Sequence, residues 1–303
     1  MRTVLATAAL RKWRVGMLDF TQAFLNAPLQ EDVWLQLPDK SVVKADKAIY
    51  GLKQSAVQWF KELRSTILAE DWHSSHYDEC LYYCQAEDGR VAILVTYVDD
   101  LLFSGDYTEE IQRMQTCLLA RFKGRDLGVP DKLLGVSVTV AHDSITLGQR
   151  AYAESIVVEG MGSTQVRKTY TPLVPEMDLS KRKENEAELD SSQFRYARIL
   201  GKLMFLAGMT RPDLSNSVRE LGPRTASPCL RHWRGLEHVL RYLASTLDIC
   251  LRYGGSNVKT EKALVGYADS DWANDAETRR SVTGYLLLMN TSPIIWRSNN
   301  RCP

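Results

Sequence analysis

The chain has 303 residues, of which 45% are hydrophobic and 25% are charged. This length and composition exclude a single small module and a disordered chain, because two domains can form and apolar material suffices for a buried core. The formal net charge of +1 excludes a global attraction to nucleic acid or to membranes, so such a partner must meet a local patch.

The cysteines are widely spaced, unlike those of a small secreted disulfide framework. They are Cys80, Cys84, Cys117, Cys229, Cys250 and Cys302. The N-terminal residues lack a signal-peptide cleavage pattern, and no apolar stretch approaches the ~18 residues of a membrane span. We therefore expect a soluble, intracellular protein in a reducing compartment.

The first half of the chain predicts mixed α and β structure from its hydrophobic periodicity. Helices are predicted over residues 1–13, from Thr21, over 53–70 and over 108–122, and strands over residues 14–19, 80–85, 91–98, 133–140 and 145–147. In the second half, residues 174–192 carry almost no large apolar side chains, which predicts a solvated linker. Helices over 194–209 and 229–245 and strands over 263–268, 282–289 and 293–298 are expected to follow it.

Two adjacent carboxylates lie in the sequence Tyr97-Val98-Asp99-Asp100, between two apolar strands. We expect this pair at the tip of a hairpin, where its charge is costly to hold unless a hard divalent cation such as Mg²⁺ neutralises it. Asp19, at the end of another apolar strand, is a candidate third ligand. On this motif alone, a polar hairpin turn without a metal remains an open alternative.

Several segments then follow one another in a recognisable order. They are DFTQAFLNAPL (19–29), YGLKQSAVQW (50–59), YVDD (97–100), DLGVPDKLLGVSV (126–138), TPL (171–173), GKLMFLAGMTRPDL (201–214), HWRGLEHVLRYLASTLDICLRY (232–253) and GYADSDWANDAETRRSVTGYLLL (266–288). Together they closely resemble the reverse transcriptase region of copia-type LTR retrotransposon Pol polyproteins, followed by the start of a ribonuclease H domain.

The resemblance implies an α+β fold with a reverse transcriptase palm and thumb, a helical connection and a partial ribonuclease H-like β-sheet. The implied domains are residues 1–170 for the palm and thumb, with the fingers truncated, 171–193 for the charged linker, 194–255 for the helical connection and 256–303 for the incomplete ribonuclease H-like domain. This chain departs from the family at Ala56, where Pro is usual.

The resemblance also assigns roles to residues of this chain. The implied catalytic residues and metal ligands are Asp19, Asp99 and Asp100, holding two Mg²⁺ ions, with Mn²⁺ as a substitute. The implied nucleotide-binding residues are Phe20, Phe24, Tyr50, Gly51, Lys53, Gln54 and Ser55, with Phe24 as the wall under the sugar. The implied primer grip is Leu134, Gly135 and Val136, and the vestigial ribonuclease H acids are Asp269 and Asp271.

The implied activity is RNA-directed DNA synthesis, in which a primer 3′ hydroxyl attacks the α-phosphate of a deoxynucleoside triphosphate. The implied partners are an RNA template, a DNA primer and deoxynucleoside triphosphates, without a membrane, in the cytoplasm or a virus-like particle. A catalytically decayed remnant that binds nucleic acid is the alternative. An unrelated Mg²⁺-dependent phosphohydrolase would not explain the ordered motifs beyond residue 120. The ribonuclease H match ends before the helix expected to carry the next acid, so we expect no RNA cleavage.

Other signals are less specific. His73, His76, Cys80 and Cys84 suggest zinc, but Cys80 and Cys84 are ~13 Å apart along a strand, too far to share one ion. Basic stripes on the two predicted helices fit a solvated face or nucleic-acid phosphates equally well. They comprise Arg231, Arg234, His238 and Arg241 on one helix and Arg195, Arg198 and Lys202 on the other. Apolar residues of the last strands are expected to be exposed or to pack back on helices 194–245; these are Leu286, Leu288, Ile295 and Trp296.

Overall fold

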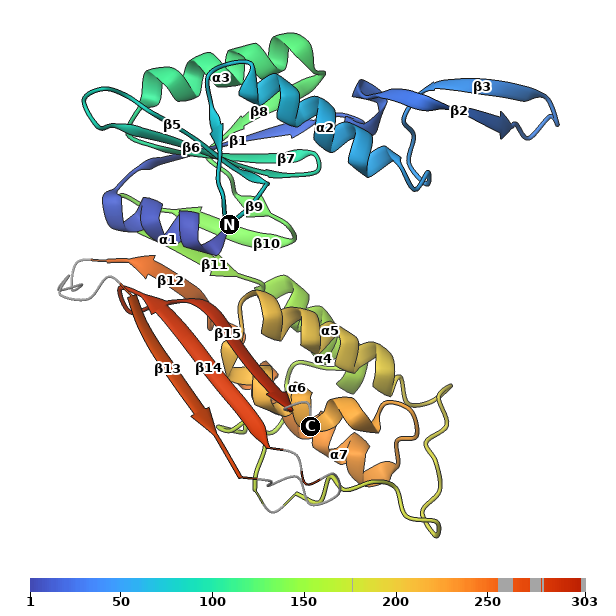
Figure 1. The fold of residues 1–303 in the computed structure, drawn as a ribbon. Coiled ribbons are helices and arrows are strands. Elements are labelled where there is room, and N and C mark those ends of the chain that lie inside the picture. Colours follow the sequence, from blue (N-terminus) through green and yellow to red (C-terminus); the bar gives the residue numbers. More distant parts are fainter. Residues whose placement is uncertain (176, 256–263, 273–278, 280, 301–303) are drawn as a thin grey trace. The chain divides into compact units, whose positions relative to one another are not determined.

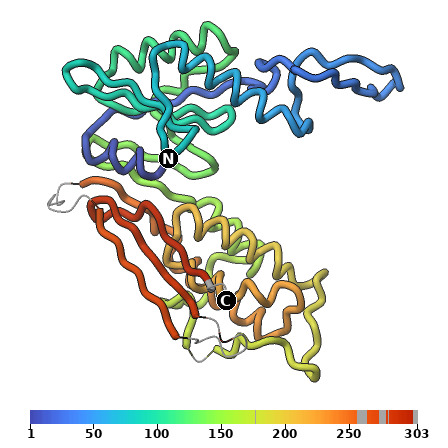
Figure 2. The backbone as a smooth tube through the Cα atoms, in the orientation of Figure 1, coloured from blue at the N-terminus to red at the C-terminus, as the bar shows by residue number. Residues whose placement is uncertain are grey.

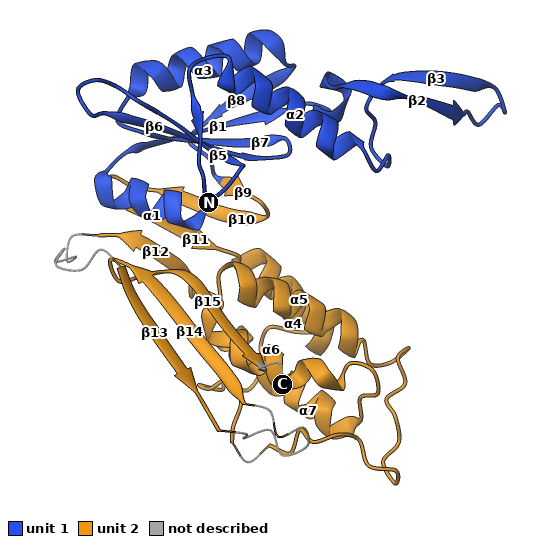
Figure 3. Ribbon diagram, in the orientation of Figure 1, with its two compact units in different colours: residues 1–131 blue, residues 132–303 orange. Residues whose placement is uncertain are grey.

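The computed structural model describes the chain except for residues 176, 256–263, 273–278, 280 and 301–303 (Figure 1). Its contacts divide the chain into two units, Met1–Asp131 and Lys132–Pro303, which are coloured separately in Figure 3. This division falls before the charged segment in which the sequence suggested a boundary, so that segment lies inside the second unit.

The first unit is built around a six-stranded sheet in the order β4-β5-β6-β7-β1-β8. Its strands are β1 (Arg14–Phe20), β4 (His73–Ser74), β5 (Leu81–Gln85), β6 (Val91–Tyr97), β7 (Asp100–Gly105) and β8 (Gly124–Gly128). Strand β7 lies between β6 and β1 and is antiparallel to both. The predicted hairpin is thus confirmed, and it places β7 beside the strand that carries Asp19.

Helices cover both faces of this sheet, as Figure 1 shows. They are α1 (Arg2–Arg11), α2 (Ser55–Leu68) and α3 (Thr108–Arg121). Apolar side chains of α2 and α3 pack with Leu18, Leu101 and Phe103 in one core. Helix α1 contacts β1 and β7. Because side chains alternate along a strand, the residues between these core positions point to the other face of the sheet.

The prediction of a helix from Thr21 is wrong. A single 3₁₀ turn, η1 (Ala23–Asn26), forms instead, and it leads into the hairpin of β2 (Pro28–Gln36) and β3 (Val42–Lys47). Gln22 has a left-handed φ of 54° before the turn, and Ala27 is extended after it. The residue before a proline avoids the helical region, so Pro28 ends the turn at Ala27.

The second unit contains two further antiparallel sheets within its described residues, in the orders β12-β11-β10-β9 and β13-β14-β15. The first sheet comprises β9 (Lys132–Leu133), β10 (Val136–Val140), β11 (Ser144–Gly148) and β12 (Leu251–Gly254). The second comprises β13 (Leu264–Ser270), β14 (Val282–Met289) and β15 (Ser292–Asn300). The three C-terminal strands expected from the sequence are therefore present.

Helices form the main core of the second unit. They are α4 (Arg150–Met161), α5 (Tyr196–Met209), α6 (Ser215–Leu221) and α7 (Leu230–Ser245), with the short 3₁₀ turns η2 (Pro212–Leu214) and η3 (Gly222–Arg224). Apolar side chains of α4, α5 and α7, among them Ile156, Leu203 and Leu240, are fully buried together. The sequence predicted α5 and α7, whereas α4 and α6 were not expected.

The charged segment between α4 and α5 is largely exposed, but it is attached to the helices. It follows the outside of the helices in Figure 2, and Arg231 of α7 donates hydrogen bonds to the carbonyls of Asp178 and Lys181 and to the carboxylate of Glu186. Leu179 and Leu189 pack on the helical core. The few apolar residues and the fixed cations of α7 together hold a segment whose overall composition suggested solvent.

The C-terminal sheet packs back on the helices, which was one of the two outcomes expected from its apolar residues. Trp296 of β15 donates its indole N–H to the carbonyl of Ala207 in α5 at 2.8 Å, and Ile294 is buried. Its neighbour Ile295 points to the other face and is exposed. In the described residues, every helix is too short or too polar to cross a membrane.

Candidate active site

Asp19 and Asp100 lie directly opposite each other on the adjacent strands β1 and β7. Directly opposed residues of an antiparallel pair share one face, with Cβ atoms about 4.5–5.5 Å apart. Leu18 and Leu101, the preceding pair in the register, are fully buried in the core under α2 and α3. The two carboxylates therefore lie on the sheet face that α2 and α3 leave uncovered.

Asp99 belongs to the two-residue turn that joins β6 to β7, next to Asp100. Val98, the other turn residue, has a φ of 55°, which is rare for a β-branched side chain. The turn is held by hydrogen bonds to both of its carbonyls. The indole N–H of Trp59 donates to Val98 O at 2.6 Å, and the backbone N–H of Phe20 donates to Asp99 O at 3.0 Å.

The electrostatics of the site follow from this clustering. Burial raises the pKa of Asp100 from 3.8 to about 6, and the negative charges of Asp99 and then Asp19 act in the same direction. Burial and the same two carboxylates also raise the pKa of Tyr50. Like charges held together in a half-buried place favour a bound cation.

The donor set suits Mg²⁺, because all three side chains present hard carboxylate oxygens. One oxygen of Asp19, Oδ2, accepts a hydrogen bond from the exposed guanidinium of Arg125 at 2.9 Å. Across the described residues, no group of three or more His, Cys, Asp or Glu side chains is arranged to hold a metal ion. The chemistry of the three acids therefore fits the ion, while their side chains adopt another arrangement in which Arg125 neutralises Asp19.

Two aromatic residues flank the acids. The rings of Phe24 in η1 and Tyr50 lie 4.4 Å apart between centroids, at an interplanar angle of 48°. Phe24 is partly buried against the core, whereas Tyr50 is 58% exposed. Because the charges of Asp99 and Asp19 act on Tyr50, this pair belongs to the surroundings of the carboxylates.

The other residues expected at the nucleotide divide into exposed and structural ones. Gly51 and Lys53 are exposed, Gln54 is half-buried, and Gly51 has a φ of 99° that favours glycine. Ser55 is buried and donates its hydroxyl to Ile49 O at 2.6 Å, which fixes the loop before α2.

The resemblance placed Phe20 among the nucleotide-binding residues, but its side chain lies in the core. It is 1% exposed and packs edge-on against Trp59 and Phe122, with ring centroids 5.7 and 5.6 Å away. Adjacent residues of a strand point to opposite faces, so Asp19 on one face requires Phe20 in the core on the other. Only its backbone N–H reaches the turn that carries the acids.

The residues expected to grip the primer form a tight turn in the second unit. Leu134 and Gly135, with φ values of 50° and 79°, connect β9 to β10, and Val136 pairs with Leu133. Two consecutive positive φ values are the pattern of a type I′ hairpin turn. The hairpin is therefore well defined within its own unit.

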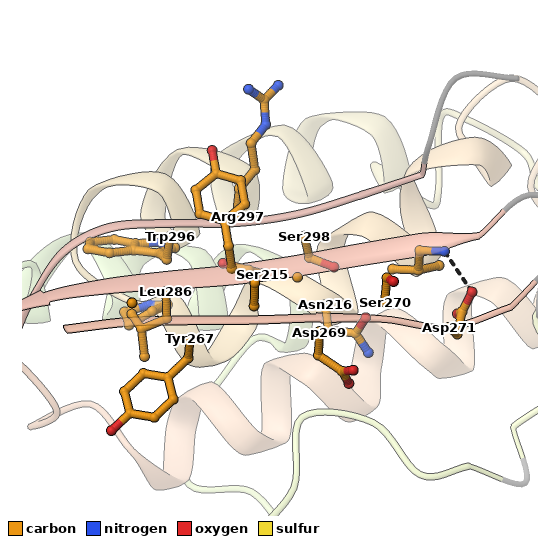
Figure 4. Close-up of a pocket in the computed structure, with 16 residues that line it drawn as sticks. Ser215, Asn216, Tyr267, Asp269, Ser270, Asp271, Leu286, Trp296, Arg297 and Ser298 are labelled. Carbon is orange, nitrogen blue, oxygen red and sulfur yellow. Dashed lines mark hydrogen bonds between the residues drawn. The ribbon is translucent and has the colours of Figure 1, made fainter.

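The C-terminal acids line a cavity of about 780 Å³ between β13, β14, β15 and the start of α6 (Figure 4). Asp269 on β13 is exposed. Asp271 accepts a hydrogen bond from the Val282 backbone N–H at 2.8 Å and so closes the junction between β13 and β14. One of the two expected acids thus has a structural role in this chain.

The basic stripes meet acids of the same unit. Glu159 of α4 pairs with Arg195, Arg198 and Lys202, and Arg231 pairs with Glu186 and Asp178. His238 is hydrogen-bonded to Thr171 O, and Arg241 lies 3.8 Å from Glu237. Arg234 is exposed. Most of these cations therefore hold the helices and the charged segment together. This role differs from the two considered from the sequence, a solvated face and contact with nucleic-acid phosphates.

Two residues at the carboxylates were not singled out from the sequence. Trp59 is 2% exposed and reaches the hairpin turn from α2, and Arg125 reaches Asp19 from β8. The position of Trp59 in the segment YGLKQSAVQW was a signal, but its apolar helical spacing indicated a core residue. Arg125 reaches Asp19 because β8 pairs with β1, and nothing in the sequence predicted that pairing.

Comparisons with known proteins identify the family. A family model described as reverse transcriptase (RNA-dependent DNA polymerase) matches residues 1–175. The retrovirus-related Pol polyprotein from transposon TNT 1-94 of Nicotiana tabacum is 31% identical over 98% of this chain and 23% of its own length. The one from transposon RE2 of Arabidopsis thaliana is 32% identical over 99% of this chain and 21% of its own length. The putative transposon Ty5-1 protein of Saccharomyces cerevisiae is 28% identical over 93% of this chain and 92% of its own length.

The chain thus spans about a fifth to a quarter of the two Pol polyproteins. The resemblance to a copia-type Pol polyprotein that the motifs indicated is confirmed by these matches along nearly the whole chain. Since the family model covers more than half of the residues, the chain belongs to the reverse transcriptase (RNA-dependent DNA polymerase) family.

Proposed function

We propose that this chain carries the nucleotidyl-transfer site of an RNA-directed DNA polymerase from a copia-type Pol polyprotein. The observation that carries the proposal is the opposition of Asp19 and Asp100 across β1 and β7, with Asp99 in the adjoining turn. In this reaction the 3′ hydroxyl of a DNA primer attacks the α-phosphate of a deoxynucleoside triphosphate paired with an RNA template, and pyrophosphate leaves.

In this proposal Asp19 and Asp99 hold the metal ions, and Asp100 lies beside them as the third carboxylate. Two Mg²⁺ ions, or Mn²⁺ in their place, would supply positive charge at the α-phosphate and lower the pKa of the attacking hydroxyl. Arg125 has to release Oδ2 of Asp19 for this arrangement. Its side chain is 71% exposed, so the guanidinium can move into solvent at little cost.

The residues around the acids suit a nucleotide. Phe24 and Tyr50 would form the wall beside the sugar and the base, and the exposed ammonium of Lys53 would meet the triphosphate. The positive φ of Gly51 leaves its backbone open to close approach by a ligand. Leu134, Gly135 and Val136 would contact the primer end.

The domain assignments complete the proposal. Residues 1–170 would be the palm and thumb, 171–193 the charged connection, 194–255 the helical connection and 256–303 the ribonuclease H-like part. The six-stranded sheet with helices on both faces supports the palm, and the β13-β14-β15 sheet supports the last assignment.

Primer extension tests the function directly. The purified 303-residue chain is given an RNA template with an annealed DNA primer, deoxynucleoside triphosphates and Mg²⁺ or Mn²⁺. We expect extension that requires the metal and is lost on Asp99→Asn. Binding of the annealed template and primer without extension under any of these conditions would support the alternative, a catalytically decayed nucleic-acid-binding remnant.

A further inference from the structure

The turn that carries Asp99 has an unusual backbone for its sequence. Of its two central residues, Val98 has a positive φ and Asp99 does not, which is the pattern of a type II′ turn. Glycine is the usual first residue of such a turn, and valine is among the residues least suited to it. Something outside the turn must therefore stabilise this conformation.

The competing conformation of the turn differs from the present one by a single peptide flip. A flip of the peptide plane between Val98 and Asp99 converts a type II′ turn into a type I′ turn, the commonest two-residue hairpin connection. Asp99 would then adopt a positive φ, which aspartate tolerates better than most residues. The flip would re-aim the Asp99 carboxylate and turn Val98 O away from its present position.

Trp59 opposes this flip. Its indole N–H donates to Val98 O, the carbonyl of that same peptide plane, at 2.6 Å. The indole is 2% exposed and is held edge-on between Phe20 and Phe122, with ring centroids 5.7 and 5.1 Å away. A buried ring with no room to rotate offers its N–H at one fixed point, so the peptide plane is fixed as well.

We propose that Trp59 is a positioning residue for the candidate active site: its indole N–H holds the Val98–Asp99 peptide and so sets the direction of the Asp99 carboxylate. The proposal rests on the proposed function for its catalytic consequence, but the effect on the turn is independent of it. Phe20 reports on the turn, because its backbone N–H donates to Asp99 O at 3.0 Å.

The experiment compares Trp59→Phe with Trp72→Phe. Trp72 is a matched control, since it is also 2% exposed in the first unit and also donates its indole N–H over 2.6 Å, but to Glu110. We expect amide hydrogen exchange of Phe20 to be about 3- to 10-fold faster in Trp59→Phe and unchanged in Trp72→Phe. In Trp59→Phe, the kcat of primer extension should fall about 10-fold or more, with an unchanged KM for the nucleotide.

Two further variants distinguish the loss of the indole hydrogen bond from a general loss of packing. Replacement of Trp59 by benzothienylalanine, in which sulfur takes the place of the N–H, keeps the ring size and should have the same effect on Phe20 exchange. Adding Val98→Gly to Trp59→Phe should restore slow exchange, because glycine favours the type II′ turn by itself.

Unchanged Phe20 exchange in both Trp59 variants would overturn the proposal, and so would equal acceleration in Trp59→Phe and Trp72→Phe. These measurements need neither metal nor substrate. If the wild-type chain extends no primer, the proposed function fails while the exchange data still decide whether Trp59 fixes the turn.

Discussion

The raised pKa of Asp100 makes the stability of the first unit depend on pH in a defined way. A rise from 3.8 to about 6 means that the folded chain favours the protonated acid. The charged form is therefore a cost that is fully present above pH 6 and disappears as the pH falls below about 4. Removal of this charge should stabilise the fold at neutral pH.

The size of the effect follows from the geometry. The rise in pKa of Asp100, from 3.8 to about 6, corresponds to about 3 kcal/mol. Burial is the largest cause of this rise, and the charges of Asp99 and then Asp19 add to it. Asp100 is only half-buried, and solvent screening leaves about 1–2 kcal/mol.

We expect Asp100→Asn to raise the free energy of unfolding by about 1–2 kcal/mol at pH 8 and to leave it unchanged at pH 4. Urea unfolding followed by tryptophan fluorescence at intervals between these pH values measures the difference. Glu87→Gln, which removes an exposed charge at the far end of β6, is the control and should have little effect. Saturating Mg²⁺ should abolish the gain, because the cation neutralises the same acids.

A stabilisation of equal size at pH 4 and pH 8 would refute this reasoning, since it would show that packing and not charge decides the effect. Titration of the Asp100 carboxyl by ¹³C NMR provides the independent check. A midpoint near 4 in the absence of metal would mean that burial and the neighbouring acids do not raise the pKa of Asp100 in the folded chain.

Four further outcomes are expected. Asp99→Asn should lower primer extension by about 10³-fold while the chain stays folded, because the proposed metal ions would contribute several kcal/mol; near-normal extension would exclude Asp99 as a ligand. Phe24→Ala should raise ribonucleotide incorporation about 10- to 100-fold if the ring excludes a 2′ hydroxyl, whereas unchanged discrimination in a competition assay would make Phe24 a core residue. An RNA–DNA hybrid should stay intact with the chain and Mg²⁺ or Mn²⁺, and cleavage that Asp269→Asn abolishes would contradict this. Gly124→Ala should destabilise the first unit by about 1–3 kcal/mol in urea unfolding, because a Cβ would lie 2.8 Å from Asp19 O and 2.5 Å from the Phe20 ring. Gly201→Ala, in open space on α5, should be neutral or stabilising by up to about 1 kcal/mol.

Much of the candidate site could be predicted from the sequence, because strand alternation and turns are local signals. The apolar runs that end at Asp19 and surround Asp99 and Asp100 indicated two strands and a hairpin, and these elements are present. The pairing of β1 with β7 is a long-range event, and periodicity cannot assign it. The strand-end position of Asp19 made it a candidate third ligand, and the family resemblance was needed to assign it a place beside Asp99 and Asp100.

The errors have physical causes of the same kind. Phe20 is next to a catalytic candidate in the motif, but the two-residue period of a strand places its side chain on the opposite face. The polar composition of the charged segment gave no sign of its attachment to α7. Partners such as Arg231, some distance along the chain, are visible only once α7 is formed. Helix α4 was missed because its apolar residues are spread around the helix and give a weak periodic signal.

The docking of the charged segment on α7 has a consequence for how the second unit opens. Hydrogen bonds to exposed carbonyls and a few apolar anchors such as Leu179 give the segment a far lower density of buried contacts than the helices beneath it. Such a region detaches as a separate cooperative step, at a free energy well below that of global unfolding. Each detachment frees Arg231 and uncovers one face of α7 while the helical core stays intact, so a protease that cuts the detached segment would leave two fragments that remain associated.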